Sequence, residues 1–186
     1  MSQQPEFRRR SAPSRIGTFT IAVVLLMRAL ASAQDVTESA LKAAFIYNFA
    51  KFTEWPAGVV PAGGPLLFCV LGDAATGEAL AGAVKGRTLA GHIMEVSQSA
   101  PDGPPRGECH VLYLSGVTAS QAATLVTGLR DAPVLTISDV DGFTQLGGIA
   151  QFFFDHGQLR FNVHAESARR ARLQISSRLL GLARTK

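Results

Sequence analysis

Short apolar segments alternate with helix-like segments through most of the chain, and this alternation is the feature that most constrains its fold. Continuous apolar runs of this length are typical of strands buried on both faces, and their alternation with helices indicates βαβ units. The prediction is a single compact α/β domain, with a mostly parallel five- to six-stranded Rossmann-like sheet flanked by helices on both faces. Strands are expected at 66–71, 93–96, 110–114, 134–137, 149–154 and 158–163.

The segments between the strands have helical spacing. The first carries Phe45, Phe49 and Phe52 on one face, and Asp35 with Glu38 resembles a capping box before it. We expect a helix of about 18 residues here, ended by the Pro/Gly loop that follows. Further helices are expected at 77–83, 118–129 and 164–183.

The last two strands are separated by His156-Gly157, a dipeptide that favours a tight turn. They are therefore predicted to form an antiparallel hairpin at one end of the otherwise parallel sheet. The Gly147-Gly148 pair before the first of them indicates a turn that needs a positive φ or a close backbone approach.

The N-terminal segment has the organisation of a secretory signal. Arginines cluster at 8–10 and 15, residues 16–27 are uncharged and apolar, and Ala31-Ser32-Ala33 is an A-x-A cleavage site. The apolar run is shorter than the roughly 20 residues that a bilayer-spanning helix needs. We predict a cleavable signal peptide at 1–33 and one α/β domain at 34–186. An uncleaved N-terminal anchor and a cytosolic chain with an incidental apolar helix are the alternatives.

Charge argues against a nucleic-acid-binding protein once this segment is set apart. The full chain has a formal net charge of +4 and a pI of about 9.5. Its first 33 residues hold five of the 18 basic and one of the 14 acidic residues, so the remaining 153 hold 13 of each. Nucleic-acid affinity depends on a surplus of Lys and Arg that neutralises phosphates. The predicted mature domain has no such surplus.

The predicted export indicates the oxidation state of the two cysteines, Cys69 and Cys109. In an oxidising compartment an even number of cysteines favours a disulfide. Cys69 lies within the first predicted strand and Cys109 just before the third, so both can lie near one end of neighbouring strands. Two buried thiols that act as small apolar side chains are the alternative.

Motifs for catalysis, metal binding or cofactor binding are missing from the sequence. There is no phosphate loop, no nucleophile elbow, and no metal-ligand spacing among the four histidines. Asp139 and Asp141 follow a predicted strand, where acid/base chemistry or a cation would be conceivable, but the same residues are good turn formers. No catalytic residue, metal or cofactor is therefore predicted. A ligand pocket at the carboxyl ends of the strands would involve Gly72, Ser115 and Asp139.

Three stretches carry a family resemblance: AAFIYNFAKF with EWP (43–56), PVLTISD with GGI (133–149), and RFNV with LQISSRLL (160–180). In this order they resemble the YfiR family of bacterial periplasmic proteins, and the resemblance covers roughly residues 39–183. This resemblance implies a compact α/β fold and a periplasmic regulator, which binds the periplasmic sensor domain of a membrane-bound diguanylate cyclase and inhibits it. It also implies an outer-membrane lipoprotein that can relieve the inhibition.

The resemblance also carries expectations for single residues. Cys69 and Cys109 match one family cysteine pair, whereas Gln145 and Phe152 lie where a second pair would be. The candidate partner-binding residues lie on the last two predicted strands: Phe152, Phe154 and Asn162. Where this chain has Asn162, relatives often have an acid. A homodimer through the exposed part of the first helix is a further partner expectation.

Three functions are thus open. The leading hypothesis is a periplasmic inhibitory partner of a membrane-bound signalling enzyme. The second is a periplasmic small-molecule binding protein that uses the Gly72, Ser115 and Asp139 pocket. The third is an enzyme that uses Asp139 and Asp141.

The signal-peptide prediction is tested by mass spectrometry of the protein recovered from the periplasm of a bacterial host. The expected N-terminus is Gln34, because cleavage follows the A-x-A site. A matched variant, Ala33→Asp, places a charge at the cleavage position and should accumulate uncleaved precursor. Periplasmic material that keeps the first 33 residues would contradict the prediction.

Overall fold

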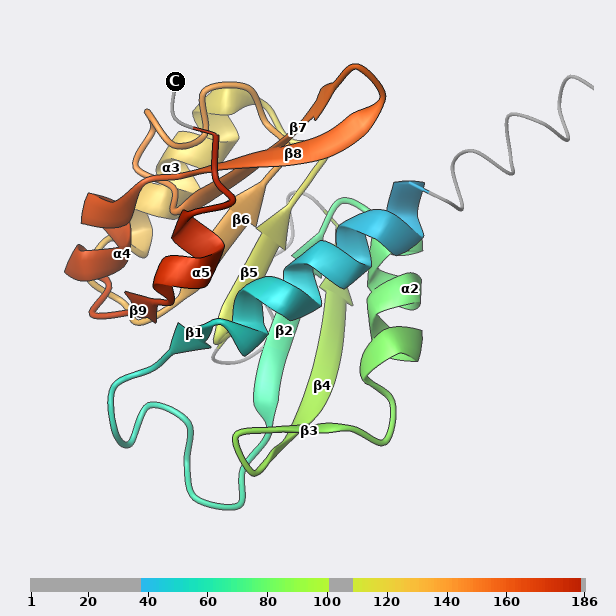
Figure 1. Cartoon of the computed structure of the whole chain (residues 1–186), viewed down its shortest axis with the longest axis vertical. Helices are drawn as coiled ribbons and strands as arrows, with labels where there is room; N and C mark the ends of the chain where they lie inside the picture. Colours follow the sequence, from blue (N-terminus) through green and yellow to red (C-terminus); the bar gives the residue numbers. More distant parts are fainter. Residues whose placement is uncertain (1–37, 101–108, 185–186) are drawn as a thin grey trace, which may run out of the picture. The chain divides into compact units, whose positions relative to one another are not determined.

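The largest element is a seven-stranded sheet, and five of its strands run parallel. The computed structural model describes residues 38–100 and 109–184, and the predicted signal peptide, Asp35 and most of the 99–107 loop lie outside them. The strand order is β3-β4-β2-β5-β6-β7-β8, with antiparallel pairing only between β3 and β4 and between β7 and β8 (Figure 1). The strands are β2 (Leu66–Leu71), β3 (Thr88–Leu89), β4 (His92–Ser99), β5 (Val111–Leu114), β6 (Leu135–Ser138), β7 (Ala150–Asp155) and β8 (Gln158–Val163).

This topology confirms the mixed α/β class and the predicted β7–β8 hairpin. The sheet has one strand more than the five to six predicted, because the two-residue β3 was not among the expected strands. A Rossmann-like arrangement is not confirmed, because residues 139–149 join the parallel strands β6 and β7 through turns and contain no helix.

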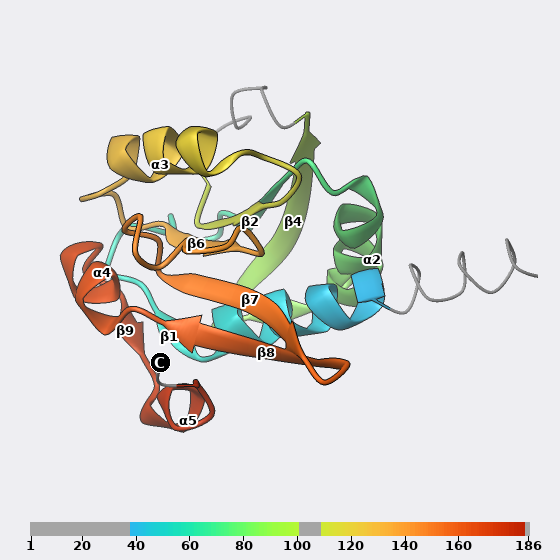
Figure 2. The same ribbon diagram turned by 90° about the horizontal axis from the view of Figure 1, so that it is seen from above.

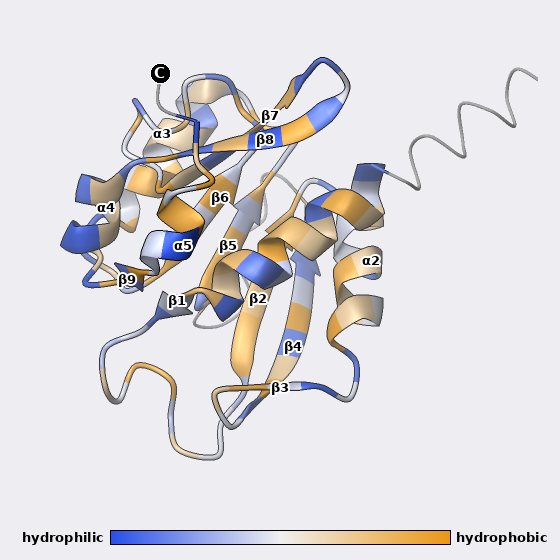
Figure 3. Cartoon of the chain, in the orientation of Figure 1, coloured by the Kyte–Doolittle hydropathy of each residue, from blue (hydrophilic) through white to orange (hydrophobic). Residues whose placement is uncertain are grey.

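Helices cover both faces of the sheet, as predicted. Helix 38–51 and α2 (Ala74–Val84) pack on one face, and α3 (Ala119–Gly128) packs on the other (Figure 2). The alternation of side chains along a strand divides the core accordingly: Phe68 and Tyr113 belong to the first face, Cys69 and Leu112 to the second. Hydrophobic colour along β2 in Figure 3 reflects its burial from both sides.

The first helix is shorter than predicted. Its described part ends at residue 51, and Thr53–Glu54 then form β1 instead of a last helical turn. β1 pairs antiparallel with β9 (Gln174–Ile175) in a separate two-stranded sheet. The Thr53 hydroxyl donates to the Phe49 carbonyl at 2.8 Å. This bond caps the end of the helix, and the strand pairing that follows fixes the chain's exit from it.

The prediction of one long helix at 164–183 was wrong. The structure has α4 (Ala165–Arg170), β9 and α5 (Ser177–Leu180) in its place. Arg172 has a φ of 58°, a left-handed conformation that cannot continue the right-handed helix α4. Leu173 is buried in the core, and the next two residues pair with β1. A tertiary strand pairing therefore overrides the helical spacing of this segment.

A disulfide and a glycine pair constrain the connections between the strands of the sheet. Cys69 and Cys109 form a disulfide with a Cα–Cα distance of 5.8 Å. Gly147 has a φ of 104°, and a Cβ on Gly148 would lie 2.1 Å from the Phe143 ring. The glycine pair is thus required by both conformation and packing, as its spacing suggested.

The Cys69–Cys109 bond gives a stability prediction. It closes a loop with a sequence separation of 40, so its loss should cost roughly 3–4 kcal/mol of unfolding free energy in the chain-entropy model. Urea unfolding of Cys69→Ala/Cys109→Ala against the oxidised wild type measures this loss, and wild type in reductant is the matched control. A double variant as stable as the oxidised protein would contradict the prediction.

Candidate functional site

Asp139 is the centre of a polar cluster at the carboxyl ends of β5 and β6. Its Oδ2 atom accepts hydrogen bonds from Lys42 Nζ at 2.9 Å, Ser115 Oγ at 2.9 Å and Tyr113 OH at 3.0 Å. Leu114 and Ser138 are paired in the parallel register of β5 and β6. The residues that follow each strand therefore meet at the same edge of the sheet.

The turn that carries Asp139 is itself fixed by a hydroxyl. Ser138 Oγ donates to the Leu114 carbonyl at 2.8 Å and accepts from the Val140 N–H at 3.1 Å. Ser138 is completely buried. The aspartate is thus presented from a rigid strand end, and its orientation does not depend on a mobile loop.

Lys42 brings the positive charge to this cluster from helix 38–51. Its side chain is only 9% exposed, and Nζ also lies 2.8 Å from Glu38 Oε1, one helical turn earlier. Burial by itself would lower the pKa of Lys42. The hydrogen bonds and negative charges of Glu38 and Asp139 outweigh it, and the pKa is raised above its ordinary value of 10.5.

Tyr113 is held neutral in the same cluster. Burial raises the pKa of its hydroxyl far above the ordinary value, and the adjacent Asp139 charge raises it further. The phenol consequently acts as a hydrogen-bond donor to Asp139 and does not ionise near neutral pH. The charged groups of the cluster are paired with one another, Lys42 with Glu38 and Asp139, as is typical of a structural network.

The predicted ligand residues come together only in part. β2 lies between β4 and β5 in the sheet, and Gly72 and Ser115 directly follow the carboxyl ends of β2 and β5. Ser115 bonds directly to Asp139, and a Cβ on Gly116 would lie 3.4 Å from the Gly72 carbonyl oxygen. Asp139 lines a cavity of about 290 Å³, but neither Gly72 nor Ser115 lines it. A pocket formed by all three residues stays a prediction.

The three predicted partner-binding residues do not share one surface. Phe152 is fully buried and packs edge-on against Phe45, with 5.8 Å between the ring centroids. Asn162 is 8% exposed, lies opposite Gln151 in the hairpin, and belongs to the other face of β8 from Phe161. Phe154 alone is substantially exposed, at 47%. A direct partner contact is therefore open only to Phe154 in this conformation.

His110 has structural hydrogen-bond partners, whereas no hydrogen bond joins Asp141 to Asp139. Buried His110 accepts the Leu67 N–H at Nδ1 and contacts the Val59 carbonyl through Nε2. Asp141 is exposed, and it is not among the hydrogen-bond partners of Asp139. Among the residues that the structure describes, no group of three His, Cys, Asp or Glu side chains could hold a metal ion.

Sequence reasoning missed a groove between helix 38–51 and the β7–β8 hairpin. Its main part, of about 360 Å³, is mostly apolar, and its walls come from the helix, β8, α5 and Leu182. Leu159 lines both this part and the 290 Å³ cavity near Asp139. We name the two together the helix–hairpin groove. The sequence signal for this groove is the helical spacing of Phe45, Asn48 and Phe52, which lie on one side of the helix and line the groove.

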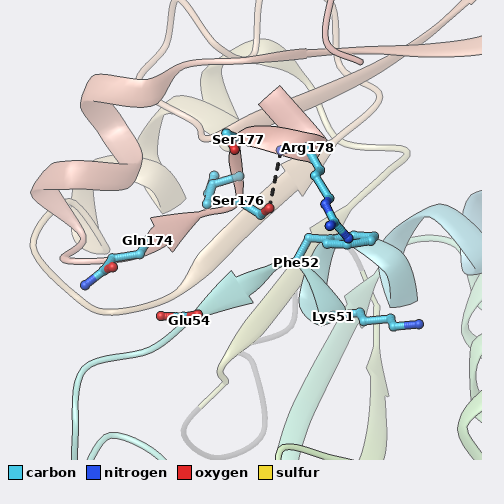
Figure 4. Close-up of a pocket in the computed structure, with 8 residues that line it drawn as sticks. Lys51, Phe52, Glu54, Gln174, Ser176, Ser177 and Arg178 are labelled. Carbon is cyan, nitrogen blue, oxygen red and sulfur yellow. Dashed lines mark hydrogen bonds between the residues drawn. The ribbon is translucent and has the colours of Figure 1, made fainter. Parts of the chain in front are cut away.

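A third cavity, of about 450 Å³, adjoins the groove at Phe52. It lies where β1 and β9 pair, and Arg178 extends toward the Phe52 ring across it (Figure 4). Lys51, Glu54 and two serine hydroxyls also line it, so this cavity is polar.

Lys42 allows a stability test with a pH signature. Lys42→Met keeps the length of the side chain but removes the charge, and should cost about 1–3 kcal/mol of unfolding free energy at neutral pH. Because the folded pKa of Lys42 is raised, its contribution is complete below pH 10.5 and is lost as pH rises through the folded pKa. The wild type and the variant should therefore converge in strong base.

Urea unfolding at neutral pH and above pH 10.5 measures both effects. Lys51→Met removes an exposed lysine of the same helix and serves as the matched control. Equal stability of the two variants, or a Lys42→Met deficit that does not shrink in base, would refute the role given to Lys42.

Comparison with known proteins places the chain by family. A family model described as YfiR/HmsC-like matches residues 39–184. No curated protein gives a significant match. The matched range contains all the strands and helices named above, apart from the first residue of helix 38–51. This chain belongs to the YfiR/HmsC-like family.

Proposed function

We propose that this protein is a periplasmic regulator that binds the periplasmic sensor domain of a membrane-bound diguanylate cyclase and holds the enzyme inactive. The family match over residues 39–184 is the observation that carries the proposal. The signal-like segment at 1–33 and the disulfide agree with an exported protein. Among the described residues, no helix is both long and apolar enough to cross a membrane.

A binding role agrees with the chemistry of the described residues. The Asp139 cluster is satisfied internally, with three donors on one carboxylate oxygen. By contrast, two large apolar side chains that line the helix–hairpin groove remain exposed, namely Phe154 and Leu182. Exposed apolar side chains that gather round a groove are typical of protein-interaction sites.

Two further partners belong to the proposal. An outer-membrane lipoprotein would compete for the regulator and so release the cyclase. A homodimer would use the outward side of helix 38–51. Cyclic di-GMP, and with it biofilm formation, would rise when the regulator is removed or sequestered.

The small-molecule and enzyme hypotheses gain no specific support. A ligand at Asp139 would have to displace Lys42 and the hydroxyls of Tyr113 and Ser115. The hydroxyl nearest to Asp139, that of Ser115, donates its hydrogen bond to this carboxylate, as Lys42 and Tyr113 do. Neither is carried forward as a second function.

Gene deletion in the source bacterium tests the proposal. Intracellular cyclic di-GMP should rise on deletion and return to the parental level when the full chain is supplied, because inhibition of a cyclase is lost and restored. The matched control supplies residues 34–186 without the signal-like segment, which should accumulate in the cytoplasm and fail to restore the level. Unchanged cyclic di-GMP in the deletion strain would refute the proposal.

A further inference from the structure

The helix–hairpin groove follows helix 38–51, with a mostly apolar main part and a part near Asp139 that is lined by charged and aromatic residues. Leu159 joins its two parts, and Phe52 joins it to the polar cavity at β1 and β9. From Glu38 to Phe52 the helix advances roughly 20 Å at 1.5 Å per residue. The groove is therefore about as long as a helix of four turns.

The floor of the groove is rigid, and its rim is exposed. Phe49, which lines it, is fully buried and packs edge-on against Phe161 at a centroid distance of 4.9 Å. On the rim, Phe154 is 47% exposed and Leu182 is 72% exposed. The Arg184 N–H donates to the Phe161 carbonyl at 2.9 Å, which ties the C-terminal segment to β8. The walls are thus held by the fold, while apolar side chains at the edge have no cover among the described residues.

The two ends of this groove carry opposite charge. At the first end three acids, Glu38, Asp139 and Asp141, line the cavity with one base, Lys42. At the other end Lys51 and Arg178 line the polar cavity with one acid, Glu54, and Arg160 lines the main part of the groove between them. An occupant with an apolar centre, basic residues at one end and acidic residues at the other would complement this surface.

We infer that the helix–hairpin groove is the docking site for an amphipathic helix of a partner protein, with a basic end over Glu38 and Asp141 and an acidic end over Lys51 and Arg178. This inference rests on the proposed function, since the partner would be the cyclase sensor domain. The partner helix would place apolar residues at positions i, i+3 or i+4, and i+7 in the groove, as in other helix-in-groove complexes.

A second copy of this chain fits the groove less well. Its exposed apolar side chains at this groove, Phe154 and Leu182, line the groove itself. In a two-fold dimer each copy contributes the same surface, so the exposed rim residues of one groove would pack against those of the other. The groove itself would stay unfilled.

Synthetic 14-residue helices test the inference without the cyclase. All share one apolar face; one has two lysines at one end and two glutamates at the other, and two controls carry only lysines or only glutamates. Fluorescence anisotropy with the purified disulfide-bonded protein should show about tenfold tighter binding of the mixed peptide. Asp141→Lys should shift preference toward the all-glutamate peptide, and Arg178→Glu toward the all-lysine peptide.

A matched pair of apolar variants tests the groove itself. Phe154→Asp should abolish binding, whereas Ile93→Asp, at a side chain 52% exposed on β4, should leave it unchanged. Thermal unfolding verifies that both variants are folded. Equal binding of the three peptides, or equal effects of the two substitutions, would overturn the inference. So would a wild-type dimer in light scattering that Phe154→Asp dissociates, since a second copy would then fill the groove.

The deletion strain separates this inference from the proposed function. If wild type restores the cyclic di-GMP level and Phe154→Asp does so equally well, the regulator role stands and the groove inference fails. If deletion has no effect on cyclic di-GMP, the proposed function fails, and the peptide experiment alone decides the groove.

Discussion

The ion pair between Lys42 and Asp139 is the interaction on which the arrangement of this domain depends. It joins a helix near the start of the described chain to the end of β6, across a sequence separation of 97. Both partners are mostly withdrawn from water, with side chains 9% and 24% exposed. Removing one of them would leave the other poorly solvated, which is more costly than the pair itself is stabilising. Helix 38–51 is thereby held to one position and one rotation about its axis.

That rotation determines which side chains of the helix are buried in the core and which remain exposed to solvent. With Lys42 directed at Asp139, Ile46 and Phe49 enter the core fully, and Phe45 meets Phe152 and Phe161 in edge-on contacts. Leu41, one position before Lys42, is consequently left 37% exposed. The groove beside the hairpin is the product of this geometry: the polar anchor at one end of the helix and the β1–β9 pairing at the other hold the helix alongside β8. The Lys42–Asp139 ion pair thus helps to shape the surface proposed for binding.

The sequence was most informative where local pattern and tertiary structure agree. Strands 66–71 and 158–163 were predicted with the bounds that they have, because each is a continuous or hairpin-bounded run with clear turn residues. Residues 164–183 misled because their apolar spacing suits a helix, while Arg172 and the pairing of Gln174–Ile175 with β1 break it. Long-range pairing of a two-residue strand leaves no periodic signal. The same reason hid Lys42: Glu38 and Lys42 have the spacing of an ordinary surface pair, and only the fold brings Asp139 to them.

The proposed regulation depends on a partner helix that binds in the groove beside helix 38–51. Two-dimensional NMR of the labelled, disulfide-bonded domain, titrated with the periplasmic domain of the proposed partner cyclase, tests for this binding. The amide signals of Phe154 and Leu182 should shift or broaden together, while that of Ile93 on β4 stays in place. Perturbation confined to the β3–β4 edge, with the groove signals unchanged, would contradict it.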